Sequence, residues 1–203
     1  VCAAGTLPAE LHKLWRAAAP GGYHMEYGYS CMGYEIAGGL GGKMALPDRE
    51  VIVMVGDGSY LMMNSEIATA VAMDKKLVIV VLDNRGFACI NRLQQACGSP
   101  PFNNLLGDCV QGAQVAPAID FAAHARSLGA EALHVASVDE LQAAMRSARE
   151  SPRTHVIVIE TDPARTTTIG GAWWEVAVPE VSARAEVRAA RAAHDAAKAR
   201  QKA

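Results

Sequence analysis

Two oxygen-bearing side chains in this sequence could together bind a divalent cation. Asp57 stands between two glycines directly after the apolar run 50–55, and Asn84 ends a second apolar run one strand–helix–strand unit later. If the two runs are neighbouring parallel strands, both side chains project from the edge of the sheet where open α/β folds bind ligands. A carboxylate and an amide oxygen suit Mg²⁺ or Ca²⁺, with phosphates and water completing the coordination. The carbonyl of Gly86 could add a third ligand, because no Cβ hinders it.

The same stretch could bind phosphate groups. Gly56 and Gly58 would let a ligand approach the backbone closely, and the amides of Gly58 and Ser59, with the Ser59 hydroxyl, would face an anion at the start of the next helix. Taken alone, such an Asp is more often a helix cap, and an Asn-x-Gly is more often a turn. Their combination at this spacing favours a metal–diphosphate site.

Two other nucleotide-binding patterns are partly present. "AGGLGGKM" lacks the first glycine of a P-loop, and Met44 follows its lysine where Ser or Thr is needed. "GDGSYL" begins like a dinucleotide-binding fingerprint, but Leu61 stands at the third glycine position. Asp83 could mimic the ribose-binding acid of that fingerprint, so a Rossmann-type NAD domain remains an alternative.

The elements that must position these residues alternate along the chain. Apolar runs predict strands over 50–55, 76–84 and 154–161, with a weaker strand over 131–137. Helical patterns cover 7–19, 31–46, 64–74, 117–129, 137–150 and 181–203. The alternation predicts an α/β fold, an open parallel sheet with helices on both faces. The stretch 86–115 is the least regular, and it follows a strand where ligands bind.

Composition narrows the class of protein. The 203 residues suffice for one well-buried domain, expected over 1–180, followed by a C-terminal helix over 181–203 that packs on the domain or on a neighbouring subunit. The net charge is −2 and no segment concentrates Lys or Arg, which argues against a nucleic-acid partner. No apolar run is long enough for a membrane span. Five cysteines without a CxxC pair indicate reduced thiols in the cytoplasm. The chain begins with Val1, and we expect a fragment of a longer polypeptide or a processed chain.

Several motifs resemble those of thiamin-diphosphate-dependent enzymes. "GDGS" followed by "LDNRGF" resembles their diphosphate signature, and "YGYSCMGYEIAGGLGGKMA" resembles the segment in which a large apolar residue keeps the cofactor bent. The chain is thus similar to the C-terminal, diphosphate-binding domain of the acetolactate-synthase-like superfamily. With "YHMEYGYSCMGYEIAGGLG", "VGDGSYLMMNSEI", "LDNRGFACINRLQ" and "AWWEVAVPEVS", it most resembles members that hydrolyse a C–C bond of a cyclic 1,2-diketone from inositol.

The resemblance implies a role for each matching residue. Asp57 and Asn84 would bind Mg²⁺ through their side chains and Gly86 through its carbonyl, and the metal would bridge both cofactor phosphates. Met32 would press between the two cofactor rings, and the Ser30 carbonyl would accept from the 4′-amino group. On its own, a Met at this place is more often core filling. Asp83 departs from the Asn of many relatives, but it precedes the ligand and leaves the assignment intact.

The family's activating glutamate has no counterpart here. In such enzymes it lies on a separate pyrimidine-binding domain and acts across a subunit interface, so the resemblance implies that partner domain, from the same or a neighbouring subunit, and a homo-oligomer. Glu26 and Glu35 flank the Met32 segment without matching that role, and solvated or capping glutamates are expected. We therefore predict no catalytic residue within these 203 residues, little cofactor binding and no turnover by this chain alone.

A few residues and functions stay open. His24, Asn91, Arg92 and Gln94 could contact a polyhydroxylated substrate or could only order their own segments. Trp173 and Trp174 are expected to cover apolar surface at a chain or subunit contact. The alternative activities are carboligation or decarboxylation of 2-keto acids, NAD binding, and a non-catalytic binding module.

Overall fold

The computed structural model describes residues 1–109, 115–167 and 175–201. Its strands are β1 (Ile52–Gly56), β2 (Val78–Asp83), β3 (Glu131–Val135) and β4 (His155–Glu160). Its helices are α1 (Thr6–Leu14), α2 (Tyr34–Ala45), α3 (Asp57–Met62), α4 (Glu66–Ala72), α5 (Ala88–Ala96), α6 (Phe121–Ser127), α7 (Val138–Glu150) and α8 (Ala185–Ala199), with one 3-10 turn, η1 (Leu106–Cys109).

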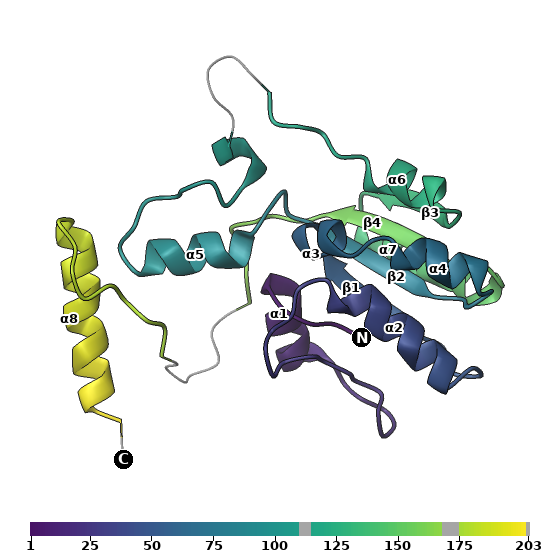
Figure 1. The fold of residues 1–203 in the computed structure, drawn as a ribbon, viewed down its shortest axis with the longest axis horizontal. Coiled ribbons are helices and arrows are strands. Elements are labelled where there is room, and N and C mark those ends of the chain that lie inside the picture. The colour runs from purple at the N-terminus through teal and green to yellow at the C-terminus, as the bar shows by residue number, and fades with distance from the viewer. Residues whose placement is uncertain (110–114, 168–174, 202–203) are drawn as a thin grey trace.

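The four strands form one parallel sheet in the order β1-β2-β4-β3 (Figure 1). β1 and β2 are direct neighbours, and Gly56 at the end of β1 pairs with Leu82 of β2. The predicted α/β fold with four parallel strands is therefore confirmed. This pairing puts Asp57 and Asn84 at the same, carboxyl edge of the sheet, as the strand spacing predicts.

Helices cover both faces of the sheet, as predicted. On one face α2, α3, α4 and α6 pack on side chains of all the central strands, including Val53, Ile79 and Val156. On the other face Ala144 and Ala148 of α7 pack on Val78 and Ile157. The β-branched residues of the strands are thus buried on both sides, which is the environment that continuous apolar strands require.

Two helices differ from the prediction. α3 begins at Asp57 itself, so the stretch after the first strand is a short helix and not a turn that leads to a helix at 64. An acidic residue in the first turn of a helix is favourable, and the buried Tyr60 holds α3 on the core. α5 lies inside the stretch 86–115 that is predicted to be irregular, because its inward residues are only Ala88 and Asn91, which give little apolar periodicity.

α5 and α8 lie beside the carboxyl edge, away from the helices that cover the sheet (Figure 1). The turn after α5 touches α8: at Gly98, with φ +84°, a Cβ would lie 2.5 Å from the carbonyl carbon of Glu186. Cys97 donates its thiol to the carbonyl of Ala177 at 3.7 Å. The start of α8 therefore contacts the turn after α5, whereas the division into a domain and a separate helix stays a prediction.

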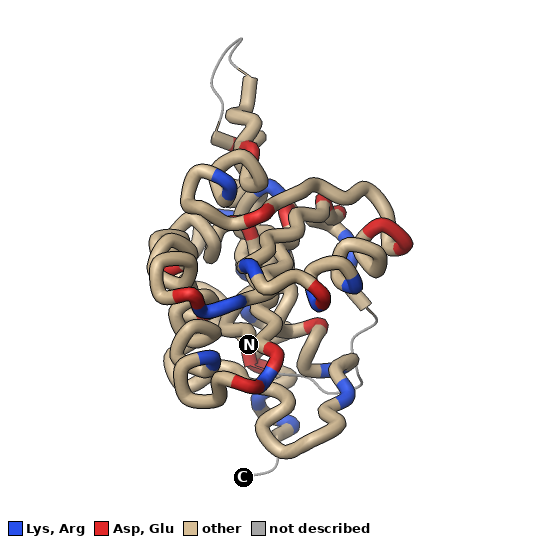
Figure 2. Tube along the Cα trace, turned by 90° about the vertical axis from the view of Figure 1, so that its right-hand side faces the viewer, with Lys and Arg blue, Asp and Glu red and all other residues tan. Residues whose placement is uncertain are grey.

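Charged residues of both signs are interspersed along the described chain (Figure 2). Within the described ranges, no helix is long and apolar enough to cross a membrane.

Candidate functional site

The site begins with Asp57, which joins the end of β1 to the loop after β2. Its side chain is only 3 % exposed, and its Oδ2 accepts the backbone N–H of Gly86 at 2.7 Å. Asp57 stands at the first position of α3, so the strand directs its side chain across the sheet edge toward the neighbouring loop. The structure thus brings together the carboxylate and the Asn-x-Gly loop that the sequence pairs.

Two oxygens at this edge lack a partner. Among the described residues, the buried atoms Asp57 Oδ1 and Asn84 Oδ1 accept no hydrogen bond. Buried polar atoms are almost always paired, so two such oxygens at the ends of neighbouring strands point to a ligand that completes them. One carboxylate and one amide oxygen form a hard donor set, which suits Mg²⁺ and fits the metal that the sequence predicts.

The protonation of Asp57 agrees with a cation at this place. Burial, helped by the nearby Asp83 carboxylate and opposed by the N–H groups of Gly86, Gly58 and Asn84, raises the pKa of Asp57 to about 6. Without a cation, the carboxylate is a buried charge that its surroundings compensate only in part. A divalent cation would restore the ionised form, because opposite charge favours it.

Gly86 is fixed by the segment that follows α5. Its φ is +140°, and a Cβ would lie 2.5 Å from the Asn104 carbonyl oxygen and 2.8 Å from Leu105 Cα. Phe87 donates its N–H to the Asn104 carbonyl at 2.7 Å, and Leu106 donates to the Arg85 carbonyl at 2.9 Å. The irregular stretch of the sequence therefore holds the loop that carries Asn84.

Gly58 is required by packing at the start of α3. A Cβ there would lie 2.6 Å from Phe87 Cε1, so the ring of the residue after Gly86 closes over the helix start. The absence of a side chain at Gly58 lets the two loops approach, in agreement with the close backbone approach expected at the glycines around Asp57.

The Met32 segment meets α3 at a left-handed glycine. Gly33 precedes α2 with φ +90°, and a Cβ would lie 3.2 Å and 3.3 Å from the Cβ atoms of Met63 and Met62. Ser30 is exposed with φ +50°, and Met32 is half-buried. Both residues precede the glycine that contacts the end of α3, but no contact of their own tests the roles that the resemblance implies.

One part of the prediction for Ser59 is wrong. Its hydroxyl does not face outward toward a phosphate: Ser59 is buried, its Oγ accepts the Gly33 N–H at 2.7 Å, and it donates to Glu35 at 2.7 Å. The core position of the neighbouring Tyr60 turns this face of α3 inward. The Ser59 amide is unaffected by this correction.

Glu35 is the residue whose place the sequence misses. It caps as expected, accepting the Gly33 N–H at 3.0 Å, but it is 1 % exposed and not solvated. The signal was a lone carboxylate inside the otherwise apolar and glycine-rich pattern 31–46. Glu26, by contrast, is exposed enough to be solvated and accepts the N–H groups of Tyr29 and Cys31.

Comparison with known proteins identifies the family. Residues 3–159 match the family of the "Thiamine pyrophosphate enzyme, C-terminal TPP binding domain", thiamine pyrophosphate being another name for thiamin diphosphate. The chain belongs to this family. It is a thiamin-diphosphate-binding domain by descent, and the NAD-domain alternative is set aside.

Two similar curated relatives carry the same name. The chain is 44 % identical over 196 residues to the 3D-(3,5/4)-trihydroxycyclohexane-1,2-dione hydrolase of Bacillus cereus (strain AH820), covering 94 % of this chain and 30 % of the relative. The enzyme of the same name from Bacillus thuringiensis (strain Al Hakam) is 43 % identical over 194 residues, with the same coverage. The chain thus spans about 30 % of the length of these relatives.

A solved structure shares the fold. The thiamine diphosphate-dependent 4-hydroxybenzoylformate decarboxylase of Rhodococcus jostii RHA1 superposes with a TM-score of 0.56 at 22 % identity, over 68 % of this chain and 25 % of that one. At this identity the likeness supports the fold alone.

The three α5 candidates of this thiamin-diphosphate domain differ in whether their polar side-chain atoms have partners. Arg92 donates to the Pro163 carbonyl at 2.7 Å and to the Thr6 hydroxyl at 2.8 Å, so it joins α5 to α1 and to the chain after β4. Gln94 bonds to Pro100 and Asn104, so it orders the segment that follows α5. Asn91 is buried, and within the described ranges its amide oxygen has no partner.

Two further predictions concern His24 and the pair of tryptophans. His24 is exposed and bonds to the Tyr34 hydroxyl at 2.7 Å, and its possible contact with substrate stays a prediction. Trp173 and Trp174 lie outside the described residues.

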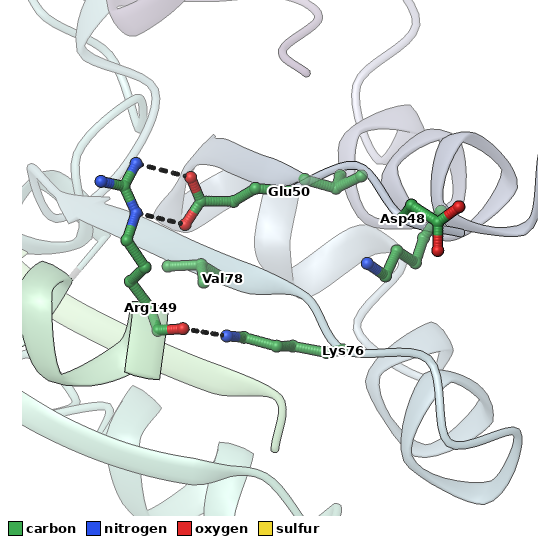
Figure 3. Close-up of a pocket in the computed structure, with 7 residues that line it drawn as sticks. Asp48, Glu50, Lys76, Val78 and Arg149 are labelled. Atoms are coloured by element: carbon green, nitrogen blue, oxygen red, sulfur yellow. Dashed lines mark hydrogen bonds and ion pairs between the residues drawn. The ribbon is translucent and has the colours of Figure 1, made fainter. Parts of the chain in front are cut away.

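The opposite edge of the sheet also carries charges, around a cavity of about 360 Å³. Arg149 pairs with Glu50 at 2.7 Å, and the Lys76 ammonium donates to the Arg149 carbonyl at 2.7 Å (Figure 3). Lys43 donates to the Arg49 carbonyl at 2.9 Å. Because these cations already have partners, this cavity at the amino edge is a poor match for the cofactor.

Proposed function

We propose that this chain is the thiamin-diphosphate- and Mg²⁺-binding domain of an enzyme that opens the ring of 3D-(3,5/4)-trihydroxycyclohexane-1,2-dione by hydrolysis of a C–C bond. The observation that supports this choice of substrate is the 44 % identity over 94 % of the chain to relatives of that name. A cyclic diketone of this kind belongs to inositol degradation, and we place the enzyme in the cytoplasm.

The cofactor assignment rests on the site itself. Asp57 and Asn84 would hold Mg²⁺ through the two oxygens that lack partners, with the Gly86 carbonyl as a third ligand. The backbone of Gly56, Gly58 and Ser59 would contact the diphosphate. Their N–H groups at the start of α3 suit an anion, and the two glycines leave the backbone accessible.

The ring end of the cofactor would lie against the turn before α2. The Ser30 carbonyl would orient the pyrimidine amino group, and the half-buried Met32 would support the bend between the rings. Thiamin diphosphate supplies a stabilised carbanion when bound, which is the chemistry that cleavage between two carbonyl carbons requires. Asn91, whose buried amide oxygen has no partner within the described residues, is our candidate for contact with a substrate hydroxyl.

The complete active site would need more than this chain. The relatives are about three times as long, and we place the activating glutamate on a pyrimidine-binding domain of the same or a neighbouring subunit, in a homo-oligomer. Glu26 and Glu35 do not replace it, because both accept backbone N–H groups beside the Met32 segment.

The test gives the full encoded polypeptide the cyclic dione and, in parallel, pyruvate, each with and without thiamin diphosphate and Mg²⁺. We expect cofactor-dependent loss of the dione and formation of a ring-opened acid. Consumption of pyruvate without consumption of the dione would replace the hydrolase by a carboligase or decarboxylase. The separate 203-residue chain should show no turnover in the same assay.

A further inference from the structure

Glu35 forms a buried bridge between two turns. Its Oε2 accepts the Gly33 N–H at 3.0 Å, and the Ser59 hydroxyl lies 2.7 Å and 2.8 Å from its two oxygens. The Ser59 Oγ also accepts the Gly33 N–H at 2.7 Å. The Gly33 N–H, the Glu35 carboxylate and the Ser59 hydroxyl therefore form one hydrogen-bonded ring. This ring joins two segments, since Glu35 and Ser59 are 24 residues apart.

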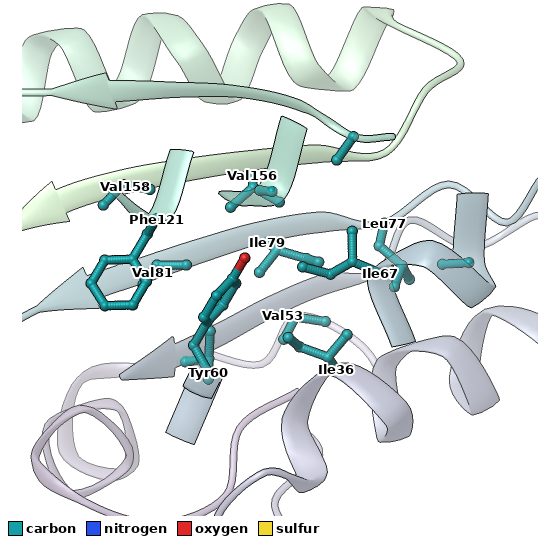
Figure 4. Packing of buried hydrophobic residues seen from close by; sticks show 14 of the residues in the cluster. Ile36, Val53, Tyr60, Ile67, Leu77, Ile79, Val81, Phe121, Val156 and Val158 are labelled. Carbon is teal, nitrogen blue, oxygen red and sulfur yellow. The ribbon is translucent and has the colours of Figure 1, made fainter. Parts of the chain in front are cut away.

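The bridge joins two turns with different tasks in the proposed function. We call Ser30–Gly33 the ring-contacting turn, and we call the end of β1 with the first turn of α3, Gly56–Ser59, the diphosphate-contacting turn. Ile36 and Tyr60, the residues that follow Glu35 and Ser59, are both buried in one core cluster (Figure 4). The core therefore anchors both segments from one side, and Glu35 joins them at the end next to the site.

A carboxylate in this place is costly for the fold. Burial raises the pKa of Glu35, while the Ser59 hydroxyl and the Gly33 N–H lower it in part. These partners are neutral groups, so hydrogen bonds rather than an ion pair hold the carboxylate. A buried carboxylate with neutral partners costs free energy of folding, and an apolar residue would pack here at less cost, so a specific role would explain its presence.

We propose that Glu35 is a positioning residue that fixes the ring-contacting turn relative to the diphosphate-contacting turn, so that thiamin diphosphate meets one rigid site and not two independent ones. The inference rests on the proposed function, since it assigns the two ends of the cofactor to these turns. Its physical basis is preorganisation: a ligand that spans two fixed segments loses less affinity to ordering them.

The contacts specify which substitutions break the bridge. Glu35→Gln can keep it, because its carbonyl oxygen can accept both donors at the Oε2 position while its amide donates to the Ser59 Oγ. Glu35→Leu removes all of these bonds at similar volume. Glu66→Gln is the matched control, because it removes the same charge at the start of α4, outside both turns.

The experiment uses calorimetry on the full polypeptide, with Mg²⁺ and either thiamin diphosphate or inorganic pyrophosphate. Pyrophosphate would contact only the diphosphate-contacting turn and the metal ligands. For Glu35→Leu we expect about tenfold weaker binding of thiamin diphosphate, with pyrophosphate affinity changed by less than about twofold. Glu35→Gln and Glu66→Gln should bind both ligands like the unsubstituted protein.

Three results would overturn the inference. In the first, Glu35→Leu binds thiamin diphosphate normally. In the second, Glu35→Leu loses affinity for both ligands to the same degree, as a merely structural defect would. In the third, Glu35→Gln loses the cofactor as Glu35→Leu does, which would make the charge decisive. If Glu35→Leu does not fold, Ser59→Ala, which removes one arm of the bridge, replaces it with the same selective loss expected. Failure of the proposed cofactor site is distinct, because the unsubstituted protein would then bind neither ligand.

Discussion

The two edges of the sheet carry polar residues that differ in how they are paired. At the amino edge, Arg149 is held by Glu50 and the Lys76 ammonium by a backbone carbonyl. At the carboxyl edge, Asp57 and Asn84 each keep a buried oxygen that no described residue satisfies. The same strands lead to both edges, so neither the fold nor its core accounts for the difference.

The pairing of polar groups therefore separates an edge with satisfied charges from an edge with unsatisfied buried oxygens. Exposed ion pairs such as Arg149–Glu50 are screened by water and add little to stability. Buried oxygens without partners cost free energy, and a domain keeps them when a ligand completes them. The charged groups of the amino edge are therefore already paired, whereas the carboxyl edge keeps the oxygens at which we propose a cation and a diphosphate to bind.

Removal of the carboxylate should have the largest effect on binding. We expect Asp57→Asn to weaken Mg²⁺-dependent binding of thiamin diphosphate by about 100-fold or more, because a direct metal ligand should matter at least as much as the groups that orient one. Calorimetry on the full polypeptide measures it. The control is Asp48→Asn at the amino-edge cavity, which should bind normally. Equal losses in the two variants would remove the distinction between the edges.

Gly86→Ala should disrupt the same site through the backbone. The residue has φ +140°, and the added Cβ would lie 2.5 Å from a backbone oxygen that cannot move independently. We expect a loss of about 2 kcal/mol in the free energy of unfolding, together with weaker cofactor binding. Gly41→Ala in α2 is the control, since its Cβ would meet nothing within 4 Å. A melting curve of Gly86→Ala that matches the control would contradict the assigned geometry.

The pH dependence of stability should reveal the buried, poorly compensated carboxylate of Asp57 at the carboxyl edge. Because the pKa of Asp57 in the folded protein is about 6, against an ordinary value of 3.8, the folded state binds this proton more tightly than the unfolded state. The stabilisation is full below pH 3.8 and is lost as the pH rises through about 6. Without metal, the protein should lose about 2 kcal/mol between pH 4 and 7 relative to Asp57→Asn.

Thermal denaturation in EDTA at several pH values tests this dependence. Added Mg²⁺ and thiamin diphosphate should remove much of the loss, because the cation replaces the proton. Parallel stability curves for the two proteins over this pH range would show that Asp57 is not a buried, poorly compensated carboxylate.

The sequence predicts the strands and the pairing of Asp57 with Asn84 because these depend on local patterns. Each strand is a continuous apolar run, and one strand–helix–strand unit separates the two residues. α5 escapes the prediction, since its buried residues include the polar Asn91 and its helix is held by tertiary contacts such as Arg92 with Thr6. The partners of Ser59 and Glu35 are also not predictable, because a bond between segments 24 residues apart depends on how α2 and α3 pack.

Glu50→Gln should have the smallest effect, and it tests whether the paired charges of the amino edge are independent of cofactor binding. Glu50 accepts two hydrogen bonds from Arg149 at 3.2 Å and 2.7 Å, and this guanidinium holds the pKa of Glu50 below its ordinary value. Because the pair is exposed to solvent, we expect a small loss of thermal stability that is greatest at low salt, with cofactor affinity unchanged. Melting curves at low and high salt, with calorimetry beside them, check both parts. A change in thiamin diphosphate binding would mean that the two edges are coupled through the strands between them, and the carboxyl edge could then no longer be treated as an independent site.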